Sequence, residues 1–331
     1  MKAVLLRQPG PASALELSEI PRPQLESPDE VLVKLKAAGV NPIDTKLRQR
    51  GTFYPELMPA ILGCDGAGVI AEVGSEVTQW CVGDEVLFCQ GGLGKRPGTY
   101  AEYAVVPSHC LARKPQPLSF TQAAALPLVT ITAWEALYDR AQLQPGQRIL
   151  IHAGAGGVGH IAIQLAKLSR AEVATTVSSP AKAEFVKQLG AELVLNYREF
   201  GWEEELQAWT GGKGVDVGFD TVGGTTLTET FSMVKPYGQV VTLLEPSPET
   251  NWKVARRRNL KVSFTMMLAP ELDDLREAQI HQAQLLQQAI GWVFSGYLQI
   301  EVAKTFPLAA AADAHRYLES GQGLGKIVLV I

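Results

Sequence analysis

The stretch "LIHAGAGGVGHIAIQLAK", residues 150 to 167, joins two apolar runs through five consecutive residues that are all glycine or alanine. The run before the glycines is rich in leucine and isoleucine and predicts a strand, while the apolar spacing after them predicts an amphipathic helix. His160 and Gln164 fall on the polar face of that helix. The stretch therefore predicts a strand, a tight turn and a helix in immediate succession.

Gly154, Gly156 and Gly159 within this turn fit the pattern GxGxxG. In such a turn the first glycine permits the bend, the second lets a diphosphate approach the backbone, and the third lets the helix pack on the strand. The positive end of the helix dipole favours an anion at the same place. We therefore predict a dinucleotide site formed by Gly154, Gly156, Gly157, Val158 and Gly159.

The surrounding chain predicts two domains of different class. Strand-like runs at 149–152, 172–177, 193–197, 215–220 and 239–244 alternate with helical segments, which is typical of a doubly wound parallel sheet of the Rossmann type. Residues 1–124 instead carry short alternating runs broken by Gly, Pro and Asp, which predict a β-rich domain. We place the dinucleotide-binding domain at 125–266 and the second domain at 1–124 together with 267–331, where the run 326–331 is expected to pair back as a last strand.

The bulk composition narrows the class of protein. The 331 residues are 46% hydrophobic and 19% charged with a net charge of −4, so nothing in the charge favours nucleic acid or anionic lipid as a partner. No run approaches the roughly 20 apolar residues of a membrane span, and the short apolar run near the N-terminus is not a signal peptide. We expect a cytoplasmic protein whose four cysteines, which include no CxxC pair, are reduced thiols. The five histidines show no ligand spacing, and none is assigned a role.

The end of the second strand run indicates which dinucleotide binds. An Asp or Glu there would bind the ribose diol of NAD, but Glu172 opens this strand and the residues after it are Ser178 and Ser179. Ser179 before Pro180 predicts a helix N-cap. Lys182 then lies in the first helical turn, where the dipole disfavours a cation.

Two interpretations of Lys182 remain open. Either its side chain points into water, or Lys182 and a serine hydroxyl hold the 2′-phosphate of NADPH. Tyr197, at the end of the adjacent strand, would add a hydroxyl in the second case and is a core aromatic in the first. We favour NADPH as the cofactor.

The chain resembles the zinc-independent quinone oxidoreductases of the medium-chain dehydrogenase/reductase superfamily, which include ζ-crystallin. The stretches that carry the resemblance are "AAGVNPIDTKLRQRG" (37–51), "LGCDGAGVIAEVG" (62–74), "GDEVLF" (83–88), "GTYAEYAVVP" (98–107), "LPLVTITAWEAL" (126–137), the glycine turn, "DTVGG" (220–224) and "GKIVLVI" (325–331). The resemblance implies a GroES-like catalytic domain beside the Rossmann domain and a homodimer.

The positions that hold catalytic zinc in related alcohol dehydrogenases differ here. Asn41 stands at the first ligand position and Cys64-Asp65 replace a His-Glu pair. A catalytic zinc needs about three protein ligands, so Cys64 is interpreted as a small buried residue. The resemblance then implies hydride transfer from NADPH to a quinone or an α,β-unsaturated carbonyl without a metal.

The resemblance also implies site residues. Asn41 would lie near the nicotinamide and offer a hydrogen bond to the acceptor oxygen, with Asp44 nearby and Tyr54 as a lid or proton donor. The alternative for Asn41 to Asp44 is a turn that starts a helix. Further cofactor contacts are expected at Thr130, Leu243, Gly325 and Lys326, the last two in a C-terminal loop over the cofactor. Phe264, Met266 and Met267 line either an apolar acceptor pocket or, as we favour, a core strand.

Three other functions stay open. An alkenal or enoyl-thioester reductase would use the same hydride geometry with a pocket for a longer chain. An NADPH-binding protein without physiological turnover would bind the cofactor but reduce nothing. A zinc alcohol dehydrogenase would require bound metal.

Overall fold

The computed structural model describes residues 1–331 as two compact units. Unit 1 comprises Met1–Leu128 and Leu268–Ile331, and unit 2 comprises Val129–Met267. The chain thus passes between the units after residues 128 and 267, where the sequence suggested 124 and 266.

Unit 2 is built on a six-stranded parallel sheet with the strand order β11-β10-β9-β12-β13-β14. The strands are β9 (Arg148–Ile151), β10 (Glu172–Val177), β11 (Leu193–Asn196), β12 (Val215–Asp220), β13 (Val234–Thr242) and β14 (Lys261–Phe264). The direction of strand succession reverses between β9 and β12, which is the switch point of a doubly wound sheet. The predicted Rossmann domain is confirmed.

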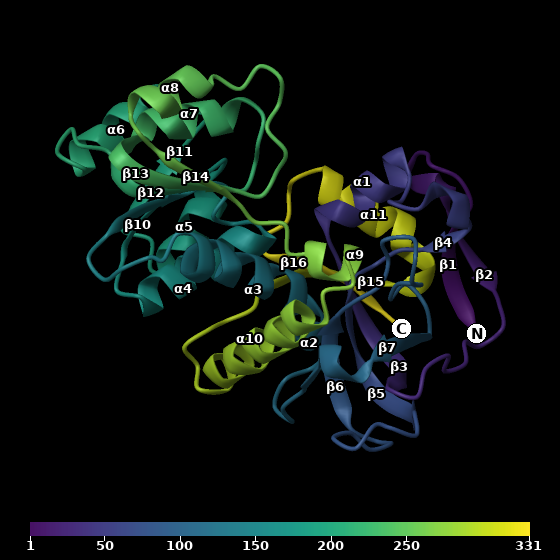
Figure 1. Cartoon of the computed structure of the whole chain (residues 1–331). Coiled ribbons are helices and arrows are strands. Elements are labelled where there is room, and N and C mark those ends of the chain that lie inside the picture. Colours follow the sequence, from purple (N-terminus) through teal and green to yellow (C-terminus); the bar gives the residue numbers. More distant parts are fainter. The chain divides into compact units, whose positions relative to one another are not determined.

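Helices cover both faces of this sheet (Figure 1). Helices α4 (Gly157–Leu168) and α5 (Pro180–Gln188) lie on one face, and α6 (Trp202–Trp209), α7 (Thr225–Met233) and α8 (Trp252–Arg257) lie on the other. The chain enters the unit through α3 (Pro127–Trp134) and a π-helix at Glu135–Arg140. Leu150, Leu206, Phe231 and Val240 are fully buried between the sheet and the second helix layer.

Strand β14 corrects one expectation. Of the run 261–264 only Phe264 was predicted to belong to a strand, a core strand, and the run forms the edge strand of the sheet. Phe264 and Met266 are half exposed, whereas Met267 is buried. Phe264 is the last residue of β14 and Met266 lies beyond the strand, so the prediction of a core strand was wrong for both.

Unit 1 contains two sheets, one of seven strands and one of three. The larger has the order β15-β16-β3-β5-β6-β8 with β7 also on β3, and the smaller has the order β2-β1-β4. The strands are β1 (Lys2–Leu6), β2 (Leu15–Glu19), β3 (Glu30–Val40), β4 (Ala60–Ile61), β5 (Asp65–Val73), β6 (Glu85–Cys89), β7 (Tyr103–Pro107), β8 (Leu111–Arg113), β15 (Val302–Pro307) and β16 (Lys326–Val330). The α-helices are α1 (Pro42–Arg50), α2 (Phe120–Ala125), α9 (Ala269–Leu272), α10 (Arg276–Phe294) and α11 (Ala311–Glu319).

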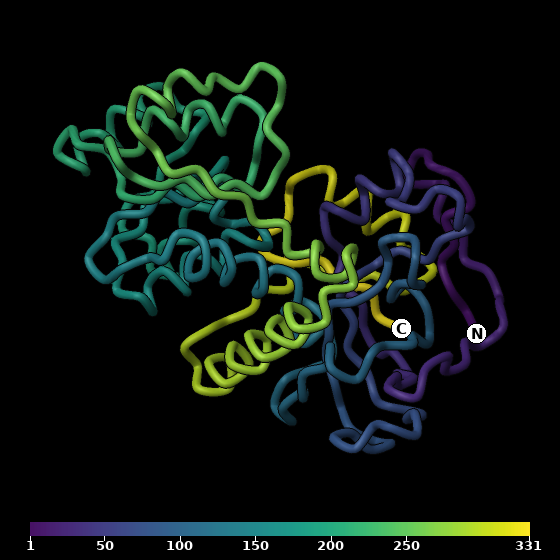
Figure 2. Tube along the Cα trace, viewed as in Figure 1, coloured from purple at the N-terminus to yellow at the C-terminus, as the bar shows by residue number.

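The end of the chain completes the larger sheet of unit 1. Strand β16 pairs antiparallel with β3, with Val328 opposite Gly39. Figure 2 shows the C-terminal segment returning among the N-terminal strands. The predicted pairing of the last strand is confirmed.

All four cysteines are free, and Cys64 is fully buried. Among the helices, none combines the length and the apolar character that crossing a membrane requires.

Candidate functional site

The glycine turn after β9 has three glycines with different reasons for lacking a side chain. A Cβ at Gly154 would lie 2.0 Å from Thr175 Oγ1, and one at Gly159 would lie 2.3 Å from the carbonyl oxygen of Ala153. At Gly156 the only atom within 4 Å would be that same carbonyl oxygen, at 3.2 Å. The fold therefore requires Gly154 and Gly159, whereas the bare backbone at Gly156 leaves room for a group from outside the chain.

The turn also presents donors to such a group. Helix α4 begins at Gly157 with Gly156 as its N-cap residue, so the first backbone N–H groups of the helix have no acceptor within it. Gly156, Gly157 and Val158 are half-buried. An anion at this terminus would be held by N–H groups and by the helix dipole, which is the chemistry a dinucleotide diphosphate requires.

Buried side chains behind the turn hold its backbone. Ala153 adopts a left-handed conformation with φ 50°, and its N–H donates to Thr176 Oγ1 at 3.0 Å. Thr176 Oγ1 lies 3.3 Å from His152 Nδ1, and His152 Nε2 lies 3.0 Å from Thr230 Oγ1. Burial lowers the pKa of His152 to about 4, so the imidazole is neutral between two hydroxyl groups. No role was assigned to His152 from the sequence, because the histidines show no ligand spacing; its partner Thr230 lies on α7, 78 positions away.

The residues that follow β10 form a second cluster, at the carboxyl ends of the parallel strands where the glycine turn also lies. Ser179 Oγ accepts a hydrogen bond from the backbone N–H of Lys182 at 3.4 Å, which confirms Ser179 as the N-cap of α5. Lys182 Nζ donates to Ser178 Oγ at 3.2 Å. The backbone N–H of Tyr197 donates to the carbonyl of Val177 at 3.2 Å, so Tyr197 lies beside the end of β10 with half of its side chain exposed.

Glu172 lies at the opposite end of β10. Its carboxylate pairs with Arg148 at 2.7 Å at the start of the strand. The half-buried residues at the carboxyl end thus offer hydroxyl and ammonium groups, which suit a phosphate.

Two other expected cofactor contacts also belong to unit 2. The Thr130 hydroxyl on α3 is fully buried and has no hydrogen-bond partner, and an unsatisfied buried hydroxyl is rare in native structures. Leu243 follows the last residue of β13, half-buried, and its N–H donates to Asp220 O at 3.1 Å. In a parallel sheet the carboxyl ends of all strands point the same way, so Leu243 after β13 and the glycine turn after β9 lie at the same end of the strands.

Asn41 of unit 1 is the N-cap residue of α1 and is part of a buried polar cluster. Its Nδ2 donates to Asp65 Oδ2 at 2.9 Å, and its Oδ1 accepts from Lys326 Nζ. Lys326 Nζ also lies 3.1 Å from Asp65 Oδ2 and 3.3 Å from the carbonyl oxygen of Val40. The other oxygen of Asp65 accepts the backbone N–H of Leu128 at 2.7 Å.

This cluster corrects the expectation for the C-terminal loop. Lys326 is the first residue of β16, and its ammonium group points into the interior of unit 1. Gly325 has φ +77°, and a Cβ there would lie 2.4 Å from the carbonyl oxygen of Glu301. Both residues are thus accounted for within unit 1.

Asp44 lies one helical turn from Asn41 and is also fully buried. Its Oδ2 accepts the backbone N–H of Asn41 at 2.8 Å and the hydroxyl of Tyr100 at 2.9 Å, whereas Oδ1 has no partner. Burial raises the pKa of Asp44 to about 7. The helix start expected for residues 41–44 is confirmed, and it leaves a carboxyl group that can hold a proton at neutral pH.

Tyr100 and His315 extend this cluster and were not found from the sequence. The Tyr100 hydroxyl lies 3.1 Å from His315 Nε2, and His315 Nδ1 lies 3.5 Å from a guanidinium nitrogen of Arg48. Burial, with Arg48 alongside, lowers the pKa of His315 to about 3. These contacts link α1 with α11, which lie far apart in the sequence.

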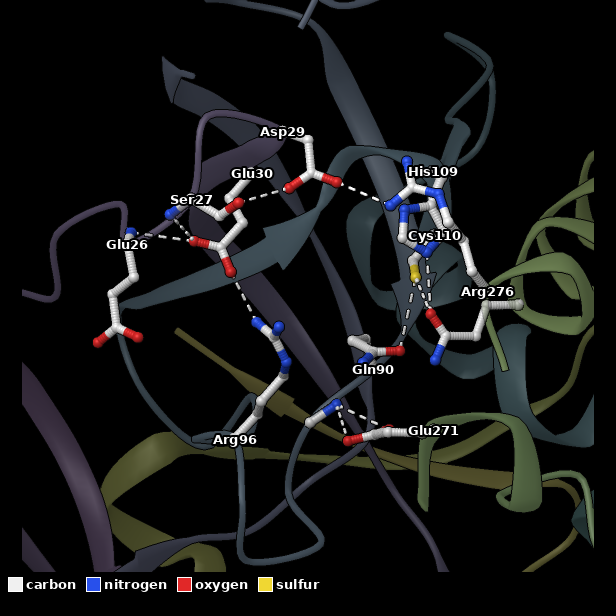
Figure 3. A network of polar contacts seen from close by, with 12 residues as sticks. Glu26, Ser27, Asp29, Glu30, Gln90, Arg96, His109, Cys110, Glu271 and Arg276 are labelled. Atoms are coloured by element: carbon white, nitrogen blue, oxygen red, sulfur yellow. Dashed lines mark hydrogen bonds and ion pairs between the residues drawn. The ribbon is translucent and has the colours of Figure 1, made fainter. Parts of the chain in front are cut away.

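Tyr54 lies against the segment that carries α9. Its hydroxyl donates to the carbonyl oxygen of Leu272 at 3.3 Å. The neighbouring Glu271 accepts the backbone N–H of Gly91 with both oxygens, at 3.0 and 3.1 Å (Figure 3). Burial raises the pKa of Glu271 to about 7.

Figure 3 also shows how the start of α10 is held. Arg276 pairs with Asp29 at 2.8 Å in this view. Gln279 bonds to His109 at 2.9 Å. The segment 271–279 is therefore fixed on unit 1 at several points, with the hydroxyl of Tyr54 as one of its contacts.

The residues at the zinc-ligand positions of related enzymes are engaged with one another. Asn41 and Asp65 bind the Lys326 ammonium, and burial raises the pKa of the Cys64 thiol well above its usual range. No group of three or more His, Cys, Asp or Glu side chains is arranged to hold a metal ion. Cys64 is buried as the sequence predicted.

Comparison with known proteins places the chain in a family. Residues 27–116 match the alcohol dehydrogenase GroES-like domain, and residues 189–329 match the zinc-binding dehydrogenase family model. The chain is 32% identical to a 2-haloacrylate reductase of a Burkholderia species, over 100% of the chain and 98% of the relative, and 34% identical to a quinone oxidoreductase of Pseudomonas aeruginosa, over 93% of each. It superposes on the Escherichia coli quinone oxidoreductase complexed with NADPH with a TM-score of 0.89, at 30% identity and over the full length of both chains. The chain therefore belongs to the zinc-independent, quinone oxidoreductase-like group of the medium-chain dehydrogenase/reductase superfamily.

Proposed function

We propose that this protein is an NADPH-dependent reductase of quinones or α,β-unsaturated carbonyl compounds that works without a metal. The observation that carries the proposal is the turn at Gly156, whose bare backbone opens beside the Ser178–Lys182 cluster at one edge of the sheet. The names of the relatives support the acceptor class, because both haloacrylates and quinones are conjugated and accept hydride readily. NADPH supplies that hydride when it is bound.

In this proposal unit 2 binds the cofactor through two anion sites. The N–H groups at Gly157 and Val158 hold the diphosphate beside the bare backbone of Gly156, and Lys182 with Ser178 holds the 2′-phosphate. Ser179 and Tyr197 contribute hydroxyl groups to the second site. Thr130, whose hydroxyl lacks a partner in the chain, and Leu243 provide the remaining contacts of this unit.

The acceptor site is proposed to use side chains of unit 1. Asn41 offers an amide N–H to the acceptor oxygen, Asp44 holds a proton near neutral pH, and Tyr54 donates a proton or covers the acceptor. We further propose a homodimer, which light scattering would measure.

The first test separates the two dinucleotides. Lys182→Ala is expected to weaken NADPH binding by about 10- to 100-fold, because a charge-assisted contact to the 2′-phosphate is lost. NADH lacks that phosphate, so its dissociation constant is expected to change less than about twofold. Both dissociation constants are measured by titrating the nicotinamide fluorescence.

Lys187→Ala is the matched control, because Lys187 lies in the last turn of the same helix and is exposed. It should leave both affinities unchanged. Equal weakening of NADPH and NADH by Lys182→Ala, or no change in either, would contradict the assignment of the 2′-phosphate site.

The second candidate is an alkenal or enoyl-thioester reductase, and the likeness to a haloacrylate reductase supports it. Steady-state turnover with quinones, alkenals, 2-haloacrylates and enoyl-CoA under the same conditions distinguishes the acceptors. Turnover confined to the unsaturated acids or thioesters would favour this candidate. NADPH binding with no turnover of any acceptor would favour a cofactor-binding protein instead.

A further inference from the structure

Lys326 places a positive charge in the interior of unit 1. Its side chain is almost fully buried, and its ammonium group contacts three oxygen atoms, which belong to Val40, Asn41 and Asp65. An ammonium group has three hydrogens to donate, so each of them has an acceptor. The cation is fully satisfied and has a fixed position.

The charges around Asn41 determine which way its amide points. The amide oxygen faces the Lys326 ammonium, and the amide nitrogen faces the Asp65 carboxylate. A flipped amide would place its NH₂ group against the ammonium and its oxygen against the carboxylate, and both contacts would be repulsive. The orientation is therefore set by the charge pair on either side.

One hydrogen of this amide has no partner in the chain. The NH₂ group carries two hydrogens, and the single contact of Asn41 Nδ2 is the bond to Asp65 Oδ2. Asn41 is buried, and a buried N–H donor without a hydrogen-bond acceptor is costly. The remaining N–H is thus a donor whose acceptor must come from outside the chain.

We propose that Lys326 is a positioning residue that locks and polarises the Asn41 amide, so that the second N–H stabilises negative charge on the acceptor oxygen. A cation at the amide oxygen draws electron density from the nitrogen and makes its N–H a stronger donor. Such fixed donors act most strongly in a water-poor interior. Lys326 therefore acts through Asn41 without touching the acceptor.

This inference rests on the proposed function and deepens it. When hydride adds to the β-carbon of an unsaturated carbonyl, the electron pair of the C=C bond moves so that negative charge develops on the carbonyl oxygen. The Asn41 N–H holds that charge until a proton, from the Tyr54 hydroxyl or from water, reaches the α-carbon. For a quinone the same charge resides on the oxygen of the hydroquinone monoanion until it is protonated.

The test compares two lysine–carboxylate pairs of unit 1 in which the lysine is buried. Lys326→Met alone leaves the Asp65 carboxylate without its cation, so the main variant is Lys326→Met with Asp65→Asn, which keeps the site neutral. The control is Lys114→Met with Glu85→Gln, because Lys114 is also buried and pairs at 2.7 Å with Glu85, which is partly exposed. Thermal unfolding and NADPH affinity are measured for both.

Binding of 4-nitrophenolate reports directly on the oxyanion site. In the presence of NADP⁺, the main variant is expected to bind this anion at least about tenfold more weakly than the wild type and to lower kcat by a similar factor, as removal of an oxyanion donor does. Its NADPH affinity is expected to stay within about twofold. The control should match the wild type in all three measurements, and equal losses in the control and the main variant would overturn the proposal.

A double-mutant cycle with Asn41→Ala separates positioning from general structure. If Lys326 acts through the amide, changing Lys326 and Asp65 in the Asn41→Ala background should alter 4-nitrophenolate affinity less than about twofold. A full tenfold loss in that background would show that Lys326 acts otherwise. If the wild type reduces no acceptor, the proposed function fails, while the comparison of anion affinities still tests the role of Lys326.

Discussion

The glycine turn of unit 2 and the Asn41 cluster of unit 1 are built in opposite ways. The turn is made of backbone within six consecutive positions, 154 to 159. The cluster is made of side chains that are 24 positions apart for Asn41 and Asp65 and 285 positions apart for Asn41 and Lys326. A backbone site is specified by local spacing, whereas a side-chain site exists only once the sheet of unit 1 has formed.

The buried groups that support the two sites also differ in charge. His152 behind the turn is neutral and bonds to hydroxyl groups. In unit 1 a lysine and a carboxylate form an ion pair in the interior, and Asp44 and Glu271 have carboxyl pKa values raised to about 7. Unit 1 should therefore respond to pH and to charge-removing substitutions more strongly around its site than unit 2 does around the turn.

The largest effect is expected within the turn, where two glycines that lack a side chain for different reasons can be compared. Gly159→Ala would place a Cβ 2.3 Å from a backbone oxygen, so we expect a loss of about 3 kcal/mol or more in the free energy of unfolding. Gly156→Ala meets nothing closer than 3.2 Å, and its φ of −81° suits alanine. It should cost less than about 1 kcal/mol of stability yet weaken NADPH binding by roughly tenfold or more.

Urea denaturation and NADPH titration of the two variants make this comparison. Each serves as the control for the other, because both replace a glycine by alanine within four positions. If Gly156→Ala bound NADPH as the wild type does, the room beside Gly156 would not be where the diphosphate lies.

A middle-sized effect is expected in unit 1 from Tyr100→Phe. The change removes the hydroxyl that contacts both Asp44 Oδ2 and His315 Nε2, and leaving buried polar atoms unpaired costs about 1–3 kcal/mol. Tyr103→Phe is the control, because Tyr103 stacks on Arg22 through its ring. Urea denaturation should show the loss for Tyr100 only, and equal losses would mean that the buried cluster contributes nothing of its own.

The same contrast explains what the sequence could predict. Five of the six strands of unit 2 follow from the alternation of strand and helix signals, and the glycine turn follows from its spacing. Strand β14 was not among these signals, because its four residues, KVSF, are too few for their alternation to stand out. His160 and Gln164 lie on the predicted polar face of α4 yet are buried, since the helix is covered further by elements such as α5, whose Phe185 ring lies 6.3 Å from that of His160.

For unit 1 the sequence predicted a β-rich domain and the return of the last strand, but not the cluster. Asn41 and Asp44 were found through resemblance to a family, whereas Tyr100 and His315 gave no signal. Lys326 was named through the resemblance, as part of a C-terminal loop over the cofactor, and its burial depends on three strands that meet only in the folded sheet. Contacts of this kind are absent from any local pattern.

The smallest effect is expected from pH at Glu271. The carboxyl group has an ordinary pKa of 4.5 and a pKa of about 7 in the folded protein, mainly because of burial, with Gly91 N–H and Arg96 acting in the opposite direction. Between these two values the folded state binds more protons than the unfolded state, so this group makes the free energy of unfolding fall as pH rises from about 4.5 to 7.

Glu271→Gln keeps an oxygen for Gly91 N–H and removes the titration. The variant should therefore gain about 1 kcal/mol relative to the wild type between pH 5 and pH 8, a value reduced for residual hydration of the half-buried group. Glu277→Gln, at an exposed glutamate of α10, is the control, and a stability difference for Glu271→Gln that stays constant across this pH range would contradict a raised pKa for the Glu271 carboxyl.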